Sequence, residues 1–73
     1  MYTIYGKPNC HNCEIAKNLL DSNKQSYQYV DVTQDSAALM YVKGLGAKSV
    51  PVVLKDDKYV GGLTELQNLI NMK

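Results

Sequence analysis

The chain contains two cysteines, Cys10 and Cys13, which are separated by two residues in the segment KPNCHNCEIAK. Thiols at this spacing serve as a redox-active dithiol, as part of a metal site or as a structural disulfide. A structural zinc site needs about four ligands, and His11 lies between the cysteines, poorly placed to share one ion with them. A structural disulfide here closes a very small loop and constrains little chain entropy. We therefore favour a redox dithiol and expect no bound metal.

The residues on either side of the cysteines predict a strand-to-helix junction. Residues 2–5 (YTIY) are β-branched and aromatic and are followed by Gly6 and Pro8, which predicts a strand. Residues 11–22 carry apolar residues at helical spacing, which predicts a helix. Polar side chains surround the cysteines, which indicates exposure rather than a pair of inert buried thiols.

This junction is expected to give the two cysteines different environments. Cys10 falls at the end of the loop, beside the free backbone N–H groups and partial positive charge of the helix N-terminus. The pKa of its thiol should therefore fall well below the free value of about 8.5, and Lys7 and a protonated His11 are candidates to add to that stabilisation. Cys13 lies further into the first turn and should be more buried. Cys10 would then attack a disulfide, and Cys13 would resolve the mixed intermediate.

The other segments predict a small α/β domain. Alternation or apolar runs predict further strands over residues 26–32, 50–54 and 58–60, and helical spacing predicts helices over residues 34–43 and from residue 64. The order is β-α-β-α-β-β-α over one domain, residues 1–73. The first two strands should be parallel through a right-handed crossover, and the last two should form a hairpin. We expect a four-stranded mixed sheet with helices on both faces.

Capping residues and inward-facing positions follow from the same patterns. Thr33 is the expected N-cap of the second helix. Thr64 and Gln67 have the spacing of a capping box at the start of the third helix. The inward residues of the second helix are expected to be Ala38, Leu39 and Val42.

The charge balance argues against nucleic acid and anionic membranes as partners. The chain has 8 basic and 7 acidic residues, and its lysines are scattered, whereas nucleic-acid and anionic-membrane surfaces need clustered positive charge. No apolar run approaches the roughly 18 residues of a spanning helix, and the N-terminal segment is typical of a strand rather than of an export leader. We expect a monomer in the reducing cytosol, where a permanent disulfide is unusual.

Two further landmarks allow both a plain and a functional interpretation. Pro51 opens the predicted strand 50–54, either as an edge feature or as a cis-proline that turns the Val50 backbone outward toward an extended peptide. Gly61-Gly62 breaks the following strand. It is at least a turn, and it is also suited to a close approach of a ligand, with the next helix N-terminus receiving a carboxylate.

Three motifs, in this order along the chain, resemble those of glutaredoxins, which belong to the thioredoxin-fold superfamily. They are YGKPNCHNC at the cysteines, KSVPVV at the proline, and YVGGLTEL at the paired glycines. The resemblance covers nearly the whole chain. It implies a thioredoxin-like fold and a thiol–disulfide oxidoreductase that uses glutathione as co-substrate, with no bound cofactor.

The resemblance also implies roles for individual residues. Cys10 would be the nucleophile and Cys13 the resolving cysteine. The remaining site residues would bind glutathione: Lys7 at its glycyl carboxylate, His11 between the cysteines, Val50 with Pro51 at its cysteinyl backbone, and Gly62, Leu63 and Thr64 at its γ-glutamyl end. Clients would be disulfide-containing proteins, with ribonucleotide reductase as one of them.

The chain departs from the family pattern at two places. His11-Asn12 replaces the usual Pro-Tyr pair, which should alter redox potential and partner choice. Thr64 stands where the family often has Asp, which should weaken the hold on the glutathione ammonium group unless Glu65 compensates.

Three rival interpretations stay open. The first is an NrdH-type redoxin reduced by thioredoxin reductase, although the segment GGLTE differs from the Ser-Gly-Phe-Arg-Pro type of that group. The second is a module that holds an iron–sulfur cluster between two monomers through Cys10 and glutathione. The third is a thioredoxin-fold adaptor without turnover.

Overall fold

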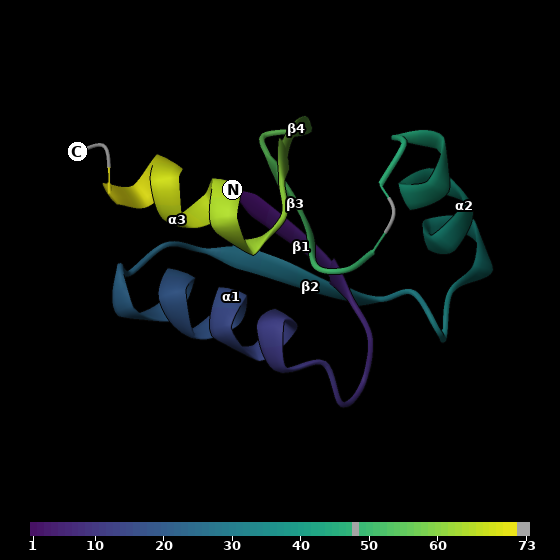
Figure 1. The fold of residues 1–73 in the computed structure, drawn as a ribbon, viewed down its shortest axis with the longest axis horizontal. Coiled ribbons are helices and arrows are strands. Elements are labelled where there is room, and N and C mark those ends of the chain that lie inside the picture. The colour runs from purple at the N-terminus through teal and green to yellow at the C-terminus, as the bar shows by residue number, and fades with distance from the viewer. Residues whose placement is uncertain (48, 72–73) are drawn as a thin grey trace.

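The elements follow one another in the predicted order, β-α-β-α-β-β-α (Figure 1). The computed structural model describes residues 1–47 and 49–71. The elements are β1 (Tyr2–Gly6), α1 (His11–Ser22), β2 (Tyr27–Asp31), α2 (Ser36–Gly44), β3 (Val52–Lys55), β4 (Lys58–Gly61) and α3 (Leu63–Asn71). The helix predicted over residues 11–22 has the bounds of α1, and the other predicted bounds agree with the observed ones to within two residues. The predicted thioredoxin-like fold class is confirmed.

The four strands form one mixed sheet in the order β2-β1-β3-β4. β1 pairs parallel to β2, with Tyr2 opposite Tyr27, and antiparallel to β3. β3 and β4 form the predicted hairpin. Asp56 and Asp57 turn the chain with φ values of 51° and 69°, the left-handed conformation that a two-residue hairpin turn requires and that Asp tolerates.

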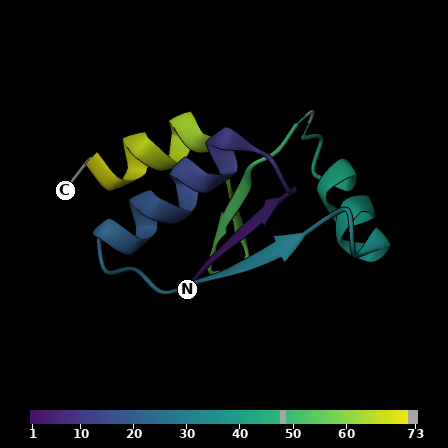
Figure 2. The same ribbon diagram turned by 90° about the horizontal axis from the view of Figure 1, so that it is seen from below.

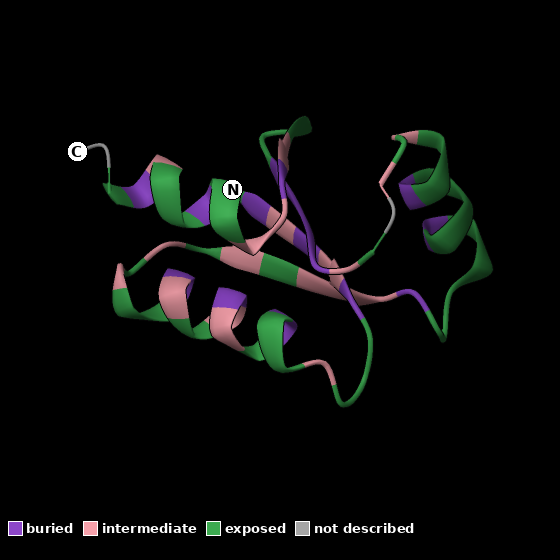
Figure 3. Ribbon diagram, in the orientation of Figure 1, coloured by how far each residue is buried: buried purple, intermediate pink, exposed green. Residues whose placement is uncertain are grey.

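Helices cover the sheet on both faces, and each face has its own apolar core. α1 and α3 lie side by side on one face, whereas α2 lies apart from them (Figures 1 and 2). Burial is concentrated on the inward sides of the helices and in β1 and β3 (Figure 3). The buried cluster under α1 and α3 consists of Tyr2, Ile4, Ala16, Leu20, Val53, Leu66 and Ile70, and the cluster under α2 of Val32, Ala38, Val42, Val52 and Leu54.

In strand β2, alternate side chains contribute to the two cores. Tyr27 and Tyr29 pack against the cluster under α1 and α3, whereas Val30 packs against the cluster under α2. The predicted alternation is confirmed. Within residues 1–47 and 49–71, no helix is long and apolar enough to cross a membrane.

The start of α2 differs from the prediction. The N-cap is Asp35, whose carboxylate accepts the Ala38 N–H at 3.1 Å. Thr33 is held instead by Asp31, which accepts the Thr33 N–H at 2.8 Å and its hydroxyl at 2.6 Å. Because its hydrogen bonds to Asp31 hold Thr33 in the preceding turn, Thr33 does not cap the helix, which begins at Ser36 after the N-cap Asp35.

The inward face of α2 is also narrower than predicted. Ala38 and Val42, one helical turn apart, are buried, whereas Leu39 is 37% exposed. The prediction for Leu39 is wrong because the next residue along a helix is rotated by about 100° away from the buried stripe.

Candidate functional site

Cys10 lies at the N-terminus of α1 because of the backbone just before it. Asn9 adopts φ 59°, a left-handed conformation that Asn tolerates, and Cys10 is extended, with φ −104° and ψ 108°. An extended residue before the first helical turn is an N-cap. The Cys10 Sγ accepts the Cys13 N–H at 3.2 Å, so a sulfur takes the place of the usual capping oxygen.

The two cysteines are joined by a disulfide, and they differ in exposure. Their Cα atoms are 5.2 Å apart, within the usual range for a disulfide. Cys13 is 0% exposed, whereas Cys10 is partly exposed. One sulfur is therefore accessible from outside and the other is not. Within the described part of the chain, no group of three or more His, Cys, Asp or Glu residues is placed to hold a metal ion.

Gly6 provides the space beneath the disulfide. A Cβ at this position would lie 2.9 Å from the Cys13 Sγ and closer still to the hydroxyl oxygen of Tyr29. Real Cβ atoms do not approach other atoms that closely, so a glycine at the end of β1 is needed for Cys13 and Tyr29 to pack here.

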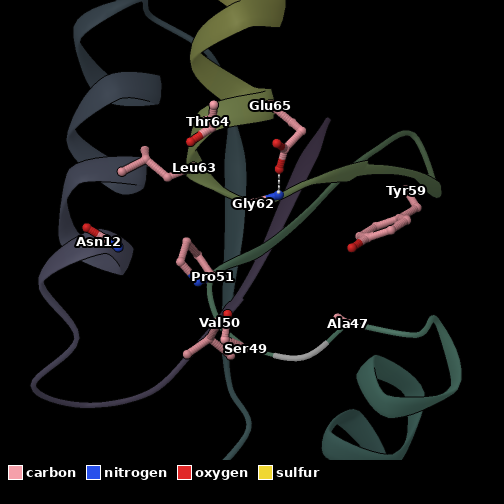
Figure 4. A pocket seen from close by; sticks show the side chains of 10 residues that line it. All are labelled: Asn12, Ala47, Ser49, Val50, Pro51, Tyr59, Gly62, Leu63, Thr64 and Glu65. Atoms are coloured by element: carbon pink, nitrogen blue, oxygen red, sulfur yellow. Dashed lines mark hydrogen bonds between the residues drawn. The ribbon is translucent and has the colours of Figure 1, made fainter.

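A groove of about 460 Å³ runs past the cysteine loop (Figure 4). It is formed by the first turn of α1, the segment before β3, strand β4 and the first turn of α3. Its lining residues are Asn12, Ala47, Ser49, Val50, Pro51, Tyr59, Gly62, Leu63, Thr64 and Glu65. The volume is in the range of small-ligand sites, and Asn12 connects the groove to the segment between the two cysteines.

The start of α3 forms one end of the groove and differs from the prediction. The helix begins at Leu63, so Thr64 lies inside it and the predicted capping box of Thr64 with Gln67 is wrong. Glu65 acts instead: its Oε1 accepts the Gly62 N–H at 2.6 Å (Figure 4). This is the acidic half of a capping box, and Gly62 has no side chain to supply the other half.

The glycine pair before α3 makes room for that carboxylate. Gly61 has φ 134°, which disfavours any side chain, and a Cβ there would collide with the Glu65 side chain at 2.6 Å. The sequence predicted that the N-terminus of this helix would be suited to a carboxylate of a ligand. In the structure the carboxylate at the N-terminus of α3 is that of Glu65.

The structure brings together five of the predicted glutathione-binding residues. Val50, Pro51, Gly62, Leu63 and Thr64 all line the groove, and the Val50–Pro51 bond is cis.

Two predicted glutathione-binding residues lie outside the groove lining. Lys7 and His11 are exposed at either side of Cys10 in sequence. The backbone carbonyl of Lys7 accepts a hydrogen bond from the Tyr29 hydroxyl at 3.3 Å. Lys48, part of the KSVPVV motif, lies outside the described residues.

Three polar or aromatic residues of the groove were not predicted from the sequence: Asn12, Ser49 and Tyr59. Glu65 was predicted only as a charge to compensate for Thr64, not as the cap of α3. Tyr59 is 48% exposed on the edge strand β4, and an aromatic residue in a short strand gives no signal of which face it takes. The capping role of Glu65 had a signal, since Glu65 lies three residues after Gly62, the position before the helix, which is the capping-box spacing.

The chain belongs to the glutaredoxin family, whose model matches residues 2–60. Over 75 residues it is 32% identical to the glutaredoxin of Haemophilus influenzae, covering 92% of this chain and 86% of that protein. It is 28% identical over 57 residues to the glutaredoxin-like protein NrdH of Lactococcus lactis, covering 78% of this chain and 79% of that protein.

The chain also resembles longer proteins. It is 46% identical over 55 residues to the gene 56 protein of Mycobacterium phage L5, which covers 74% of this chain. The match spans 53% of that protein and 61% of the gene 56 protein of phage D29.

Solved structures share the fold. The buckwheat glutaredoxin–glutathione complex superimposes with a TM-score of 0.82 at 26% identity, covering 97% of this chain and 68% of the other. The NrdH-redoxin of Escherichia coli gives a TM-score of 0.84 at 22% identity, covering 97% and 91%. At that identity the second comparison shows the fold alone.

Proposed function

We propose that this member of the glutaredoxin family is a thiol–disulfide oxidoreductase that reduces protein disulfides and glutathione mixed disulfides. The observation that carries the proposal is the Cys10–Cys13 disulfide, with one sulfur at a helix N-terminus and the other buried. The Cys10 thiolate attacks a substrate disulfide, forms a mixed disulfide and displaces the first substrate thiolate. Cys13 then attacks the Cys10 sulfur, which forms the Cys10–Cys13 disulfide and releases the second thiolate.

Glutathione is the proposed reductant that restores the dithiol. One glutathione thiolate opens the Cys10–Cys13 disulfide, and a second releases the first as oxidised glutathione, so two thiols are oxidised for each disulfide reduced. The groove has the volume for an extended tripeptide and borders the cysteine loop. The similarity to the buckwheat glutaredoxin, a protein solved with glutathione, supports this assignment.

The groove residues suit different parts of glutathione. In this proposal the Val50 backbone, next to Pro51, pairs with the cysteinyl residue, and Gly62, Leu63 and Thr64 hold the γ-glutamyl end. Lys7 and His11 are exposed beside Cys10, and in this proposal their side chains reach the glycyl end from outside the groove lining.

Glu65 is the proposed partner of the glutathione ammonium group. Thr64 carries no charge, and Glu65 is the charged residue among the described residues of the lining. Its Oε1 is engaged with the Gly62 N–H, which leaves Oε2 for a cation. This arrangement would offset the loss of the acidic side chain that the family often has at position 64.

The proposed setting is the reducing cytosol, where the protein would act as a monomer on disulfide-containing proteins. Ribonucleotide reductase is one proposed client, and the similarity to the NrdH protein of L. lactis supports a place among small redoxins of this kind.

An NrdH-type redoxin reduced by thioredoxin reductase is the second candidate. The same L. lactis relative favours it. The segment Gly62–Glu65, with its acidic cap, favours glutathione instead, because it builds one wall of a groove that a tripeptide can fill.

A coupled NADPH-oxidation assay on the oxidised protein separates the two candidates. One reaction contains glutathione and glutathione reductase, and the other contains thioredoxin reductase alone. We expect turnover with glutathione. Turnover with thioredoxin reductase only would overturn the glutathione assignments of Val50, Gly62 and Thr64 while leaving the Cys10–Cys13 chemistry in place.

A further inference from the structure

The buried sulfur of Cys13 lies close to a phenol. If Gly6 carried a Cβ, that atom would lie 2.9 Å from the Cys13 Sγ and closer still to the Tyr29 hydroxyl oxygen. Because both atoms lie within 2.9 Å of the same position, the distance between the Cys13 Sγ and the Tyr29 hydroxyl oxygen is less than twice 2.9 Å. Cys13 comes from α1 and Tyr29 from β2, so the parallel pairing of β2 with β1 creates this proximity.

The Tyr29 hydroxyl makes only a long hydrogen bond in the oxidised protein. It donates to the Lys7 carbonyl oxygen at 3.3 Å, whereas O–H···O bonds are usually about 2.7–2.8 Å. A hydroxyl proton rotates freely about its C–O bond, so a better acceptor nearby can capture it.

Charged groups surround the Tyr29 ring on the α1 side. The Lys17 Nζ lies 4.5 Å from the ring centroid and pairs with Glu14 at 3.1 Å. Burial raises the pKa of Tyr29 above its ordinary value, Lys17 opposes that change, and Glu14 and Asp31 add to it. The phenol therefore stays protonated at neutral pH and remains a donor.

Cys13 needs such a donor during the resolving step. To attack the Cys10 sulfur it must become a thiolate, although it is 0% exposed and burial disfavours the charged form. In the oxidised protein the Cys13 N–H is directed to the Cys10 Sγ and not to the Cys13 sulfur.

We propose that Tyr29 is a positioning residue for the resolving thiolate: when the disulfide opens, its hydroxyl turns from the Lys7 carbonyl to the Cys13 Sγ. The Lys17 ammonium over the ring strengthens the phenol as a donor. The proton of the Cys13 thiol goes to solvent, the Cys13–Cys10 bond forms as the Cys10–substrate bond breaks, and the departing substrate thiolate takes up a proton. This inference rests on the proposed function in that Cys13 is the resolving cysteine.

The chain offers a matched control for this proposal. Tyr27 is two residues earlier on β2, packs against the same core, and donates its hydroxyl to Asp21 at 3.3 Å. Tyr29→Phe and Tyr27→Phe each remove one hydroxyl from the same face of the same strand, and only the first removes the group beside Cys13.

The first measurement is the pH titration of the Cys13 ¹³Cβ chemical shift in a Cys10→Ser background. We expect Tyr29→Phe to raise the midpoint by about one pH unit, since a hydrogen bond to a charged group is lost. Tyr27→Phe should leave it unchanged. Equal midpoints in all three proteins, or equal increases in both variants, would overturn the proposal.

The second measurement follows the two steps with 5,5′-dithiobis(2-nitrobenzoate). The reduced protein releases one thionitrobenzoate when Cys10 attacks and a second when Cys13 resolves. Tyr29→Phe should leave the first phase unchanged and slow the second about threefold at pH 7. The lower thiolate fraction is partly offset by the greater nucleophilicity of a more basic thiolate.

These readouts distinguish failure of the inference from failure of the proposed function. If Cys13→Ser retains the second phase, Cys13 is not the resolving cysteine and the proposed function fails. If Cys13→Ser abolishes it and Tyr29→Phe leaves it at the unsubstituted rate, only the inference fails. Should Tyr29→Phe not fold, Lys17→Met keeps the phenol, and the proposal requires it to raise the Cys13 midpoint as well.

Discussion

At the scale of single residues, one short motif places two sulfurs in different environments. Cys10 caps α1 and is partly exposed, whereas Cys13, three residues later, points into the protein and is fully buried. A helix rotates by about 100° per residue, so three residues nearly complete a turn and bring both sulfurs within bonding reach. The two sulfurs differ in exposure because Cys13 faces the sheet beside Gly6, whereas Cys10 lies at the end of the loop before α1.

Cys13→Ser tests this division of tasks. The variant should still reduce glutathione mixed disulfides, because Cys10 and external glutathione suffice for that exchange. It should lose dithiol turnover on protein disulfides, measured as insulin reduction. Equal loss in both assays would contradict the assignment of Cys13 as the resolving cysteine.

Gly6→Ala tests the packing beneath the disulfide. The added methyl group meets both the Cys13 sulfur and the Tyr29 ring, so we expect a loss of about 1–3 kcal/mol in the free energy of unfolding by urea.

Gly44→Ala is the matched control for that substitution. A Cβ at Gly44 meets nothing within 4 Å, and this residue lies at the end of α2. The control should be neutral or stabilising by up to about 1 kcal/mol. If Gly6→Ala behaved like the control, the contact of Gly6 with Cys13 and Tyr29 would be wrong.

At the scale of elements, two acidic side chains determine where α2 and α3 begin. Asp35 caps α2 from the N-cap position, and Glu65 reaches back from the third position of α3. Both satisfy backbone N–H groups that the helix leaves free. In α3 the residues of this cap, Gly62 and Glu65, also line the groove.

The cap of α2 is tested by Asp35→Ala beside Thr33→Ala. Loss of the Asp35 carboxylate should cost about 1 kcal/mol of unfolding free energy and speed amide hydrogen exchange in the first turn of α2. Thr33→Ala should leave exchange in α2 unchanged, because its hydroxyl bonds to Asp31 in the preceding turn. The reverse ranking would restore Thr33 as the cap.

The cap of α3 is tested by Glu65→Gln. The amide oxygen keeps an acceptor for the Gly62 N–H, so unfolding free energy should barely change. The charge is lost, so the KM for glutathione should rise about two- to fivefold, the value of an exposed ion pair. A KM that stays the same or falls would show that Glu65 does not pair with the glutathione ammonium group.

At the scale of the whole molecule, the site lies where three segments distant in sequence meet. The first turn of α1, the segment before β3 and the first turn of α3 converge on one groove, and the α1–α3 core holds them in place (Figures 1 and 4). Leu66 in α3 is fully buried and shares that cluster with Leu20 of α1 and Val53 of β3.

Leu66→Ala tests this dependence. Removing a fully buried Leu costs about 2–5 kcal/mol, a large share of the stability of a small domain. We expect a sharply lower thermal midpoint and, where the protein remains folded, weaker glutathione turnover. Leu69→Ala, at a half-buried position of the same helix, is the control and should cost clearly less. Similar losses from both would contradict the assigned core.

The sequence by itself determined the order of elements, the parallel and hairpin pairings, and the position of the cysteine pair. These depend on local signals: apolar periodicity, glycine and proline breaks, and the spacing of Cys10 and Cys13. For the start of α2, the pattern predicted Thr33 and not Asp35 as the N-cap, because the hydrogen bonds by which Asp31 holds Thr33 depend on backbone geometry.

Only the tertiary structure decided which distant residues meet. Glu65 fills the space above the glycine pair, and Tyr59 joins the groove wall from an edge strand. Tyr29 comes beside Cys13 only through the register of β2 on β1 and the missing side chain of Gly6. Periodicity assigns a residue to a face of its own element, whereas contacts across the fold depend on how the faces of different elements are packed together.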